Sequence, residues 1–263
     1  MEDFTYHRPV LVNELIELLA PRAGALVLDG TCGGGGHAEA ILQTGADVVG
    51  LDQDPDAINH AAERLSRFGG RVTLRQANFR EAGKVLDQLG IIGLGAALLD
   101  LGVSSRQLEN AERGFSIMRN GPLDMRMDPR RELTAADVIN SYSEEELTRL
   151  FRDLGEEPAA RRIASQLVKQ RKTAPFRETV QLARAIEKIV WRHGRKHPAT
   201  QVFQALRMEV NDELNALEEG LRALTKRLES GARFVVITFH SLEDRIVKNF
   251  FRDRSREFLD RPE

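Results

Sequence analysis

The sequence predicts an α/β fold, with a doubly wound, mostly parallel sheet and an inserted all-helical domain. From residue 25 to residue 100, short apolar runs alternate with helical patterns, which is typical of parallel strands joined by helices. From about residue 107 to residue 198, amphipathic helical patterns follow one another with no convincing strand between them. We therefore expect a sheet domain formed by residues 1–106 and 199–263, with a helical domain at 107–198 inserted between its two parts.

Length and composition favour a soluble globular protein. The 263 residues are enough to bury a proper core, and the single cysteine excludes a disulfide framework and fits a reducing compartment. The first residues lack the basic start and apolar core of a signal peptide, and no run approaches the roughly 18 apolar residues of a membrane span. We therefore expect a cytoplasmic protein that does not interact with membranes.

The stretch from residue 25 to residue 52 forms the centre of the predicted sheet. Its pattern indicates a strand over 25–29 that ends at Asp29, a loop with four successive glycines at 33–36, a helix, and a second strand over 47–52 that ends at Asp52. The glycines allow backbone N–H groups to approach a ligand closely at the positive end of the helix. In a doubly wound sheet, a carboxylate in the place of Asp52 binds the two hydroxyls of a ribose. The stretch therefore predicts a nucleoside site.

The glycine loop also narrows the choice of nucleoside ligand. A phosphate-binding Walker loop ends in Gly-Lys-Ser/Thr, whereas these glycines lead into His37 and Ala38. A Walker-type phosphate site is therefore excluded. The Gly-x-Gly-x-x-Gly pattern of dinucleotide sites is matched only weakly. S-adenosylmethionine suits the loop better, because its ammonium group favours a carboxylate such as Asp29 and it has no pyrophosphate. A turn without a ligand would need only one or two glycines.

The other elements of the sheet domain follow in order along the chain. Asp54 and Pro55 predict the N-cap and the first position of a helix that reaches about Phe68. Phe79 follows the third strand, where it could flank an adenine or belong to the core. His7, before the first helix, could reach a substrate. The remaining predicted elements are helices over 9–20 and 200–230 and strands over 72–76, 91–99 and 232–238.

Polar side chains follow the fourth and fifth strands at the carboxyl edge of the sheet, where open parallel sheets bind their ligands. Asp100, Ser104 and Ser105 follow the fourth strand, and we expect them to contact the ligand and the acceptor. A helix cap is the alternative role for Asp100. His240 and Asp244 follow the fifth strand and are candidates for the acceptor side, while a buried histidine with satisfied hydrogen bonds is the usual alternative.

A basic segment lies in the predicted helical domain. Residues 161–197 contain 11 lysines and arginines against 2 acidic residues, a local charge of +9 in a chain with a net charge of −2. A solvated helix face usually balances its charges with acids on neighbouring turns, so we expect a phosphate-binding surface here. Trp191 could stack on an unpaired base or anchor the core. The basic side chains on this surface are Arg161, Arg162, Lys169, Arg171, Lys172, Arg184, Lys188, Arg192, Arg195 and Lys196.

Six short sequence blocks are spread over nearly the whole chain: GGGGH at 33–37, DLGVSS at 100–105, ERGFS at 112–116, GPLDMRM at 121–127, HPAT at 197–200 and FHSLEDR at 239–245. In sequence and in order, these blocks resemble the signature motifs of the MraW family, ribosomal RNA small subunit methyltransferase H. The resemblance implies a class I methyltransferase, with a Rossmann-like sheet. It also implies transfer of a methyl group from S-adenosylmethionine to the exocyclic N4 of a cytidine in the decoding region of small-subunit ribosomal RNA.

The resemblance implies site residues and partners as well. Carried over by position, the cofactor contacts are Gly35, Gly36, His37, Asp52, Phe79, Asp100 and Gln107. The implied partner is small-subunit ribosomal RNA or an immature small ribosomal subunit. The implied cofactor is S-adenosylmethionine, with no metal, and a homodimer is compatible with the resemblance. The family continues into a sixth and a seventh strand, which usually form a hairpin at the sheet edge, whereas this sequence stops at Glu263.

Methyl transfer from a sulfonium to an amine depends mainly on alignment, which can be worth roughly 7–11 kcal/mol. The lone pair of the cytidine amine is conjugated with the ring, so an acceptor at the amino hydrogens would favour the reactive nitrogen. The candidate acceptors are Asp100, backbone carbonyls near Gly102, and Asp244, and His240 is a further catalytic candidate. Many amino methyltransferases carry Asp-Pro-Pro-aromatic where this chain has Asp-Leu-Gly. Methylation at C5 is disfavoured, because it needs a cysteine nucleophile and Cys32 lies in the cofactor loop.

Two other classes of function are compatible with parts of the pattern. An RNA-binding ribosome assembly factor could keep a non-catalytic cofactor pocket, but a disused pocket has no reason to keep the glycine loop together with Asp29, Asp52 and Asp100. A small-molecule methyltransferase would not need the basic helical insertion. The combination therefore favours a ribosomal RNA methyltransferase.

Overall fold

The computed structural model describes residues 9–190 and 197–259, with side chains to residue 255. The chain divides into two compact units, which we call the sheet unit (Met1–Gly102 with Leu214–Glu263) and the helical unit (Val103–Glu213). The helical unit extends further at both ends than the insertion expected from the sequence. Several residues named above lie outside the described residues: His7, Trp191, Arg192, Arg195 and Lys196.

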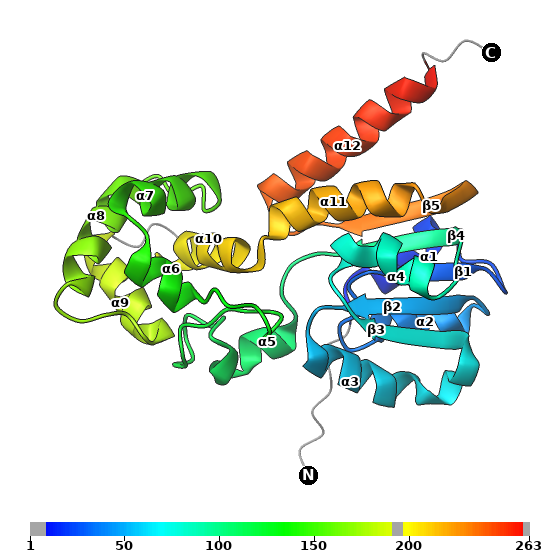
Figure 1. The fold of residues 1–263 in the computed structure, drawn as a ribbon, viewed down its shortest axis with the longest axis horizontal. Helices are drawn as coiled ribbons and strands as arrows, with labels where there is room; N and C mark the ends of the chain where they lie inside the picture. Colours follow the sequence, from blue (N-terminus) through cyan, green and yellow to red (C-terminus); the bar gives the residue numbers. More distant parts are fainter. Residues whose placement is uncertain (1–8, 191–196, 260–263) are drawn as a thin grey trace. The chain divides into compact units, whose positions relative to one another are not determined.

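In the described part of the chain, the sheet unit is built on a five-stranded parallel sheet, which confirms the predicted α/β fold (Figure 1). The strands are β1 Leu26–Asp29, β2 Asp47–Asp52, β3 Val72–Gln76, β4 Leu94–Asp100 and β5 Leu228–Ile237. Their order is β3-β2-β1-β4-β5, and each neighbouring pair is parallel. The bounds of β2 and β3 are as predicted, whereas β4 begins later and β5 begins earlier than the sequence indicated.

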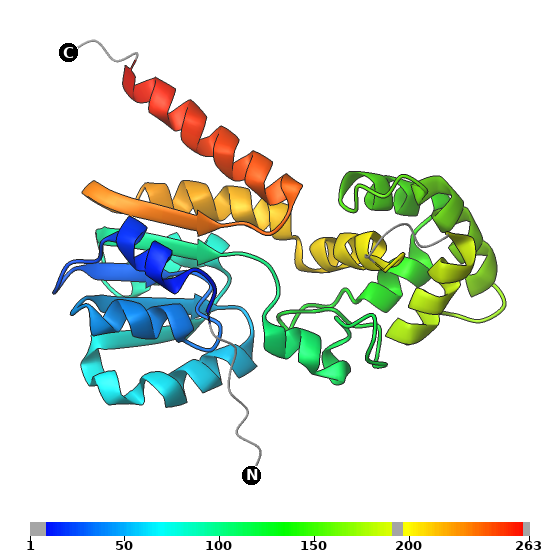
Figure 2. The ribbon, with the colours of Figure 1, turned by 180° about the vertical axis from the view of Figure 1, so that it is seen from behind.

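Helices cover both faces of this sheet. They are α1 Val12–Leu19, α2 Gly36–Gln43, α3 Pro55–Leu65, α4 Ala82–Gln88, α11 Glu213–Thr225 and α12 Ser241–Leu259. Val27 and Val48 pack with α1, α2 and α3, whereas Leu28 and Leu51 pack with α4, α11 and α12. Figure 2 shows helices on both faces of the sheet. Burial on both faces explains why the strands are almost continuously apolar.

Helix α3 begins as the sequence predicts. The Asp54 side chain accepts a hydrogen bond from the backbone N of Asp56 at 3.0 Å, and Pro55 occupies the first helical position. The helix ends earlier than predicted, and the 3₁₀ helix Ser66–Arg71 leads into β3. Helix α1 likewise lies inside the predicted range 9–20.

The prediction of one long helix over 200–230 is wrong, because the chain breaks the helix at Asp212. Helix α10, Thr200–Asn211, ends in a left-handed residue, Asp212 with φ of 52°, and α11 begins at the next residue. Apolar residues recur at helical spacing along 200–230 and form an apolar stripe. This stripe is divided between two cores. Phe203, Leu206 and Val210 pack in the helical unit, and Leu217, Leu221 and Leu224 pack in the sheet unit. Both halves keep helical spacing, so periodicity does not reveal the break.

The helical unit has a hydrophobic core of its own. Its helices are α5 Ser105–Glu109, α6 Ala135–Ser141, α7 Glu144–Asp153, α8 Ala160–Arg171, α9 Thr179–Ile189 and α10. Phe151 is fully buried among apolar side chains of these helices. Ser143 and Glu146 form a capping box at the start of α7, as their spacing predicts. Among the described residues of both units, no helix is both long and apolar enough to cross a membrane.

Asn211 fixes the irregular segment that precedes α6. This fully buried side chain accepts a hydrogen bond from the backbone N of Met127 at 2.8 Å. Its amide nitrogen donates to the carbonyl oxygens of Met125 and Arg207, both at 2.8 Å. Met125 has φ of 64°, a conformation that non-glycine residues rarely adopt. The amide of Asn211 thus joins helix α10 to the backbone groups of Met125 and Met127, which are not part of a helix or sheet.

We expect Asn211→Ala to destabilise the helical unit by about 2–4 kcal/mol, because buried backbone groups of Met125 and Met127 would lose their partners. Urea denaturation followed by circular dichroism measures this change. Gln170→Ala removes an exposed amide from α8 and is the control, with an expected change near zero. Equal effects of the two substitutions would contradict this role of Asn211.

Candidate active site

The loop after β1 is tied to β4 by backbone hydrogen bonds. The backbone N of Gly30 donates to the carbonyl oxygen of Leu98 at 2.9 Å. The backbone N of Asp100 donates to Oγ1 of Thr31 at 2.6 Å. These contacts bring the glycine loop and Asp100 together at the carboxyl edge of the sheet, where ligands bind in such folds.

Asp52, at the end of β2, determines the course of the glycine loop. Its Oδ2 accepts a hydrogen bond from the backbone N of Gly33 at 2.8 Å, and its Oδ1 accepts one from the backbone N of Asp54 at 2.9 Å. Gly33 and Gly35 have φ of 51° and 80°, which glycine adopts without strain. The half-buried carboxylate is therefore held in a fixed orientation beside the loop.

Gly36 and His37 begin α2 against the segment that precedes α1. A Cβ atom on Gly36 would lie 2.9 Å from Cγ of Pro9, so a larger residue does not fit without movement. Nε2 of His37 lies 2.8 Å from the carbonyl oxygen of Val10, which can only accept a hydrogen bond. Nδ1 of the same buried ring lies 3.6 Å from Oδ2 of Asp100. The structure thus brings two predicted site residues, His37 and Asp100, into contact.

Asp29 is a fully buried carboxyl group at the end of β1. Its Oδ1 accepts a hydrogen bond from the backbone N of Thr31 at 3.2 Å, but the described residues offer no hydrogen-bond partner to Oδ2. Burial raises the pKa of Asp29 to about 7, although His37 acts in the opposite direction. Asp52 and Asp100 raise the same pKa further through repulsion of like charges. The group would be stabilised by a bound cation.

For two of the predicted cofactor contacts, Phe79 and Gln107, the structure shows contacts with the protein's own residues. Phe79 is half-buried in the core of the sheet unit, and a Cβ atom on Gly220 would lie 2.4 Å from its ring, so the core role holds. Gln107 belongs to the helical unit, where its side chain and that of Ser104 form a capping box at the start of α5. Ser104, rather than Asp100, is therefore the cap. Contact of Phe79 or Gln107 with a cofactor stays a prediction.

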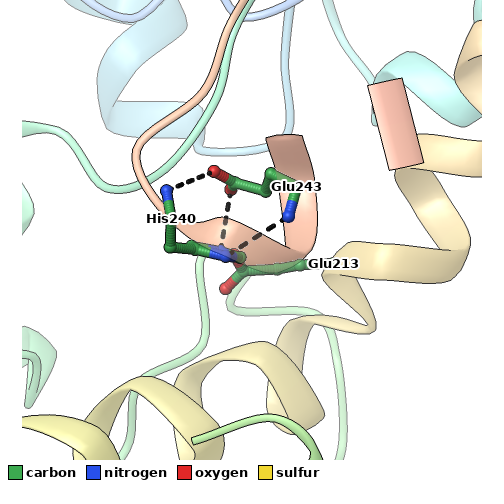
Figure 3. Close-up of side chains that lie close together, drawn as sticks. All are labelled: Glu213, His240 and Glu243. Carbon is green, nitrogen blue, oxygen red and sulfur yellow. Dashed lines mark hydrogen bonds and ion pairs between the residues drawn. The ribbon is translucent and has the colours of Figure 1, made fainter. Parts of the chain in front are cut away.

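His240 is held by Glu243, a residue that the sequence analysis did not select (Figure 3). Oε2 of Glu243 accepts hydrogen bonds from the backbone N of Phe239 at 2.9 Å and of His240 at 3.3 Å. Nε2 of His240 lies 3.1 Å from Oε1 of Glu243, and its Nδ1 accepts from the backbone N of Glu243 at 3.4 Å. Asp244, the other candidate for the acceptor side, forms an ion pair with Lys248 at 2.8 Å.

The signal for Glu243 was present in the sequence. His240 directly precedes α12, and Glu243 lies three residues later, the spacing of a capping box. A glutamate at this position reaches back to the backbone N–H groups that begin the helix. Glu213, also drawn in Figure 3, forms an ion pair with Arg207 of the helical unit at 2.8 Å.

Known proteins with similar sequences reveal the family. The family model of the MraW methylase family matches residues 4–262. The chain belongs to this family. The protein named ribosomal RNA small subunit methyltransferase H in Carboxydothermus hydrogenoformans is 56% identical over 250 residues, which cover 94% of this chain and 80% of the relative. The protein of that name in Heliobacterium modesticaldum is 49% identical over 265 residues, covering 98% and 85%. The predicted family is therefore confirmed.

The single cysteine of this methylase is unsuited to nucleophilic attack. Cys32 is buried in the glycine loop, with a side chain that is 4% exposed. Burial raises the pKa of the Cys32 thiol well above its ordinary value, and the nearby Asp29 raises it further. The thiol therefore stays protonated near neutral pH, which argues against a covalent attack on a pyrimidine ring.

Asp29 gives the ligand-free methylase a pH-dependent stability. Its folded-state pKa lies near 7, above the ordinary value of 3.8, so the fold favours the protonated carboxyl group. The stabilisation from protonated Asp29 is complete below about pH 4 and is lost as the pH rises through 7. Asp29→Asn keeps a neutral group at every pH. The variant should therefore gain stability over the unsubstituted chain between pH 4 and pH 8, by an amount on the order of 4 kcal/mol.

Urea denaturation of both proteins at several pH values measures this gain. Glu63→Gln, which neutralises an exposed carboxylate on α3, is the matched control and should show no such trend. If the difference in free energy of unfolding between Asp29→Asn and the unsubstituted chain stays constant over this pH range, the pKa of Asp29 is not raised by folding.

Proposed function

We propose that this methylase transfers a methyl group from S-adenosylmethionine to the N4 amine of a cytidine in small-subunit ribosomal RNA. The names of the relatives and membership of the family support the reaction class and the RNA substrate. The observation in the structure that supports the proposal most directly is the buried Oδ2 atom of Asp29, for which the described residues offer no hydrogen-bond partner. It lies beside a glycine loop at the ligand-binding edge of a parallel sheet.

The residues around the glycine loop fit this cofactor. When bound, S-adenosylmethionine supplies an electrophilic methyl group on a positively charged sulfur. In this proposal, Asp29 interacts with the cofactor's ammonium group, which would satisfy its buried oxygen and lower its raised pKa. Asp52 binds the ribose hydroxyls, while its bonds to Gly33 and Asp54 keep its carboxylate oriented. The other proposed contacts are Gly35, Gly36, His37, Phe79, Asp100 and Gln107.

Asp100 is the residue that we propose as the acceptor for the amino hydrogens of the cytidine. Its side chain is 22% exposed at the end of β4, and its backbone N is fixed by Thr31. A carboxylate at this point would draw the nitrogen lone pair out of conjugation and stabilise the positive charge that develops on the nitrogen. It can then take the proton that the methylated amine must lose. His240 and Asp244 remain proposals for the acceptor side, and the capping box gives His240 the more defined position.

The basic segment carries exposed cationic side chains on and next to α8 and α9, which we call the cationic face. Its acids do not neutralise it, because Glu187 pairs with His197 at 2.9 Å and Glu178 accepts a hydrogen bond from Asn120. For several exposed side chains of this face, the described residues offer neither an ion pair nor a hydrogen bond: Arg161, Arg162, Lys169, Lys172, Arg184 and Lys188. We propose that this face binds RNA phosphates, whose charge would replace the missing acids.

The cationic face is hollowed at the beginning of α8. A cavity of about 520 Å³ is lined by Glu144, Pro158, Ala159, Arg161, Arg162, Ser165 and Gln166. Two guanidinium groups, a hydroxyl and an amide are donors that bind phosphate and ribose oxygens. The cavity therefore supports a backbone contact that is independent of base sequence.

The proposed reaction is tested by incubating the chain with labelled S-adenosylmethionine and immature small subunits that lack the modification, followed by nucleoside analysis. We expect label in N4-methylcytidine, and none with free cytidine or a protein mixture. Asp100→Asn should lower the rate of transfer by roughly 100-fold to 1,000-fold, because the amide cannot take up the proton. Asparagine keeps one oxygen that accepts hydrogen bonds, so the affinity for S-adenosylhomocysteine should fall far less than the rate of transfer. Cofactor binding without transfer to any RNA would contradict the proposed reaction and favour an assembly role.

The cationic face predicts a salt-dependent contribution to RNA affinity. Arg161→Ala combined with Arg162→Ala should weaken binding of small-subunit RNA and reduce the slope of log affinity against log salt by roughly one to two. Lys226→Ala, an exposed lysine of the sheet unit, is the matched control and should leave the slope unchanged. Filter binding at several salt concentrations measures the slope. An unchanged slope in the double variant would exclude these arginines from the RNA contact.

A further inference from the structure

An exposed aromatic side chain lies at the ligand-binding edge of the sheet. Phe239 follows the end of β5 by two residues, and 58% of its side chain is exposed. β5 pairs with β4 so that Ile237 lies opposite Asp100, and the backbone N of Leu101 donates to the carbonyl oxygen of Ile237 at 3.0 Å. Phe239 therefore leaves the sheet beside the residue proposed to receive the amino hydrogens.

The ring of Phe239 rests on a glycine. A Cβ atom on Gly102 would lie 3.4 Å from Cδ2 and 3.8 Å from Cγ of the ring. Gly102 has φ of 98°, a conformation that disfavours any other residue, so no side chain covers the ring from this position. One edge of the ring is thus supported by backbone, and the exposed part is open to solvent.

The turn that carries Phe239 is fixed rather than adaptable. The backbone N of Phe239 donates to the carboxylate of Glu243, a residue that is 3% exposed. The same carboxylate contacts both the backbone and the ring of His240 (Figure 3). A buried carboxylate that binds two backbone N–H groups holds the start of α12 and the preceding residues in one conformation. The aromatic ring is therefore presented to solvent from a prepared position.

We propose that Phe239 stacks on the target base and so holds its amino group toward Asp100. A planar base offers an apolar face that matches an exposed ring, and enzymes that modify a base take it out of its own stack. An aromatic platform replaces the stacking that the base loses in the RNA. This inference rests on the proposed function and adds to it a residue that binds the acceptor.

Substitution of Phe239 separates stacking from other roles. We expect Phe239→Leu, which keeps an apolar side chain without a flat ring, to raise KM for immature small subunits by roughly 5-fold to 100-fold. Phe239→Tyr keeps a flat ring, so its KM should stay close to that of the unsubstituted chain. Affinity for S-adenosylhomocysteine should be the same in all three proteins. Phe251→Leu, the same change at a partly exposed phenylalanine of α12, should leave KM unchanged.

A fluorescent base provides a readout that a structural role would not affect. Pyrrolocytidine is placed in RNA at the cytidine that nucleoside mapping identifies as the target. Binding of the unsubstituted chain should quench its fluorescence through stacking, and Phe239→Leu should quench it much less. A KM and quenching equal to those of the unsubstituted chain would overturn the inference. Weaker binding of S-adenosylhomocysteine to Phe239→Leu would also overturn it, because Phe239 would then belong to the cofactor pocket.

The same assays distinguish this inference from the function on which it rests. Absence of methyl transfer to RNA by the unsubstituted chain would overturn the proposed function, and the stacking role with it. Normal transfer that is unaffected by Phe239→Leu would overturn the stacking role alone.

Discussion

The two hydrogen bonds accepted by the Asp52 carboxylate are the constraint on which the proposed nucleoside site depends. Gly33 lies where the loop turns through a glycine conformation, and its backbone N–H binds this side chain rather than the backbone of a strand. Asp52 accepts from Gly33 on one side and from Asp54 on the other, so the glycine loop and the start of α3 share one anchor. The position of α2, and with it the contact between His37 and Asp100, follows from this anchor.

The site also concentrates negative charge around one small volume. Asp52 and Asp100 both raise the pKa of Asp29, whereas His37 and the hydrogen bond from the backbone N of Thr31 lower it. A cationic ligand is favoured in such a field, and the proposed cofactor carries its positive charges on sulfur and on the ammonium group. Transfer of the methyl group leaves the sulfur neutral. The site therefore attracts the proposed product less strongly than the substrate, which favours exchange after each reaction.

Local sequence signals predicted much of the fold and part of the candidate site. The bounds of β2 and β3, the cap at Asp54 and the capping box at Ser143 depend on neighbouring residues and were readable from them. Contacts between residues that are distant in the sequence could not be predicted, because no spacing encodes them. Examples are the contacts of Thr31 with Asp100 and of His37 with Val10. The break at Asp212 was hidden since the apolar stripe continues through it. Glu243 was overlooked in favour of Asp244, although its spacing from His240 was visible.

The interruption of the sheet by the helical unit has a consequence for the order in which the protein is made. β4 ends at Asp100, and its neighbour β5 begins only at Leu228, so the ribosome synthesises the helical unit before β5 exists. Until then β4 has an open edge, which is a template for pairing with other chains. Helices form from local contacts and fold quickly. An early-folding insertion shortens the flexible connection between β4 and β5, and so limits the time during which the incomplete sheet is exposed.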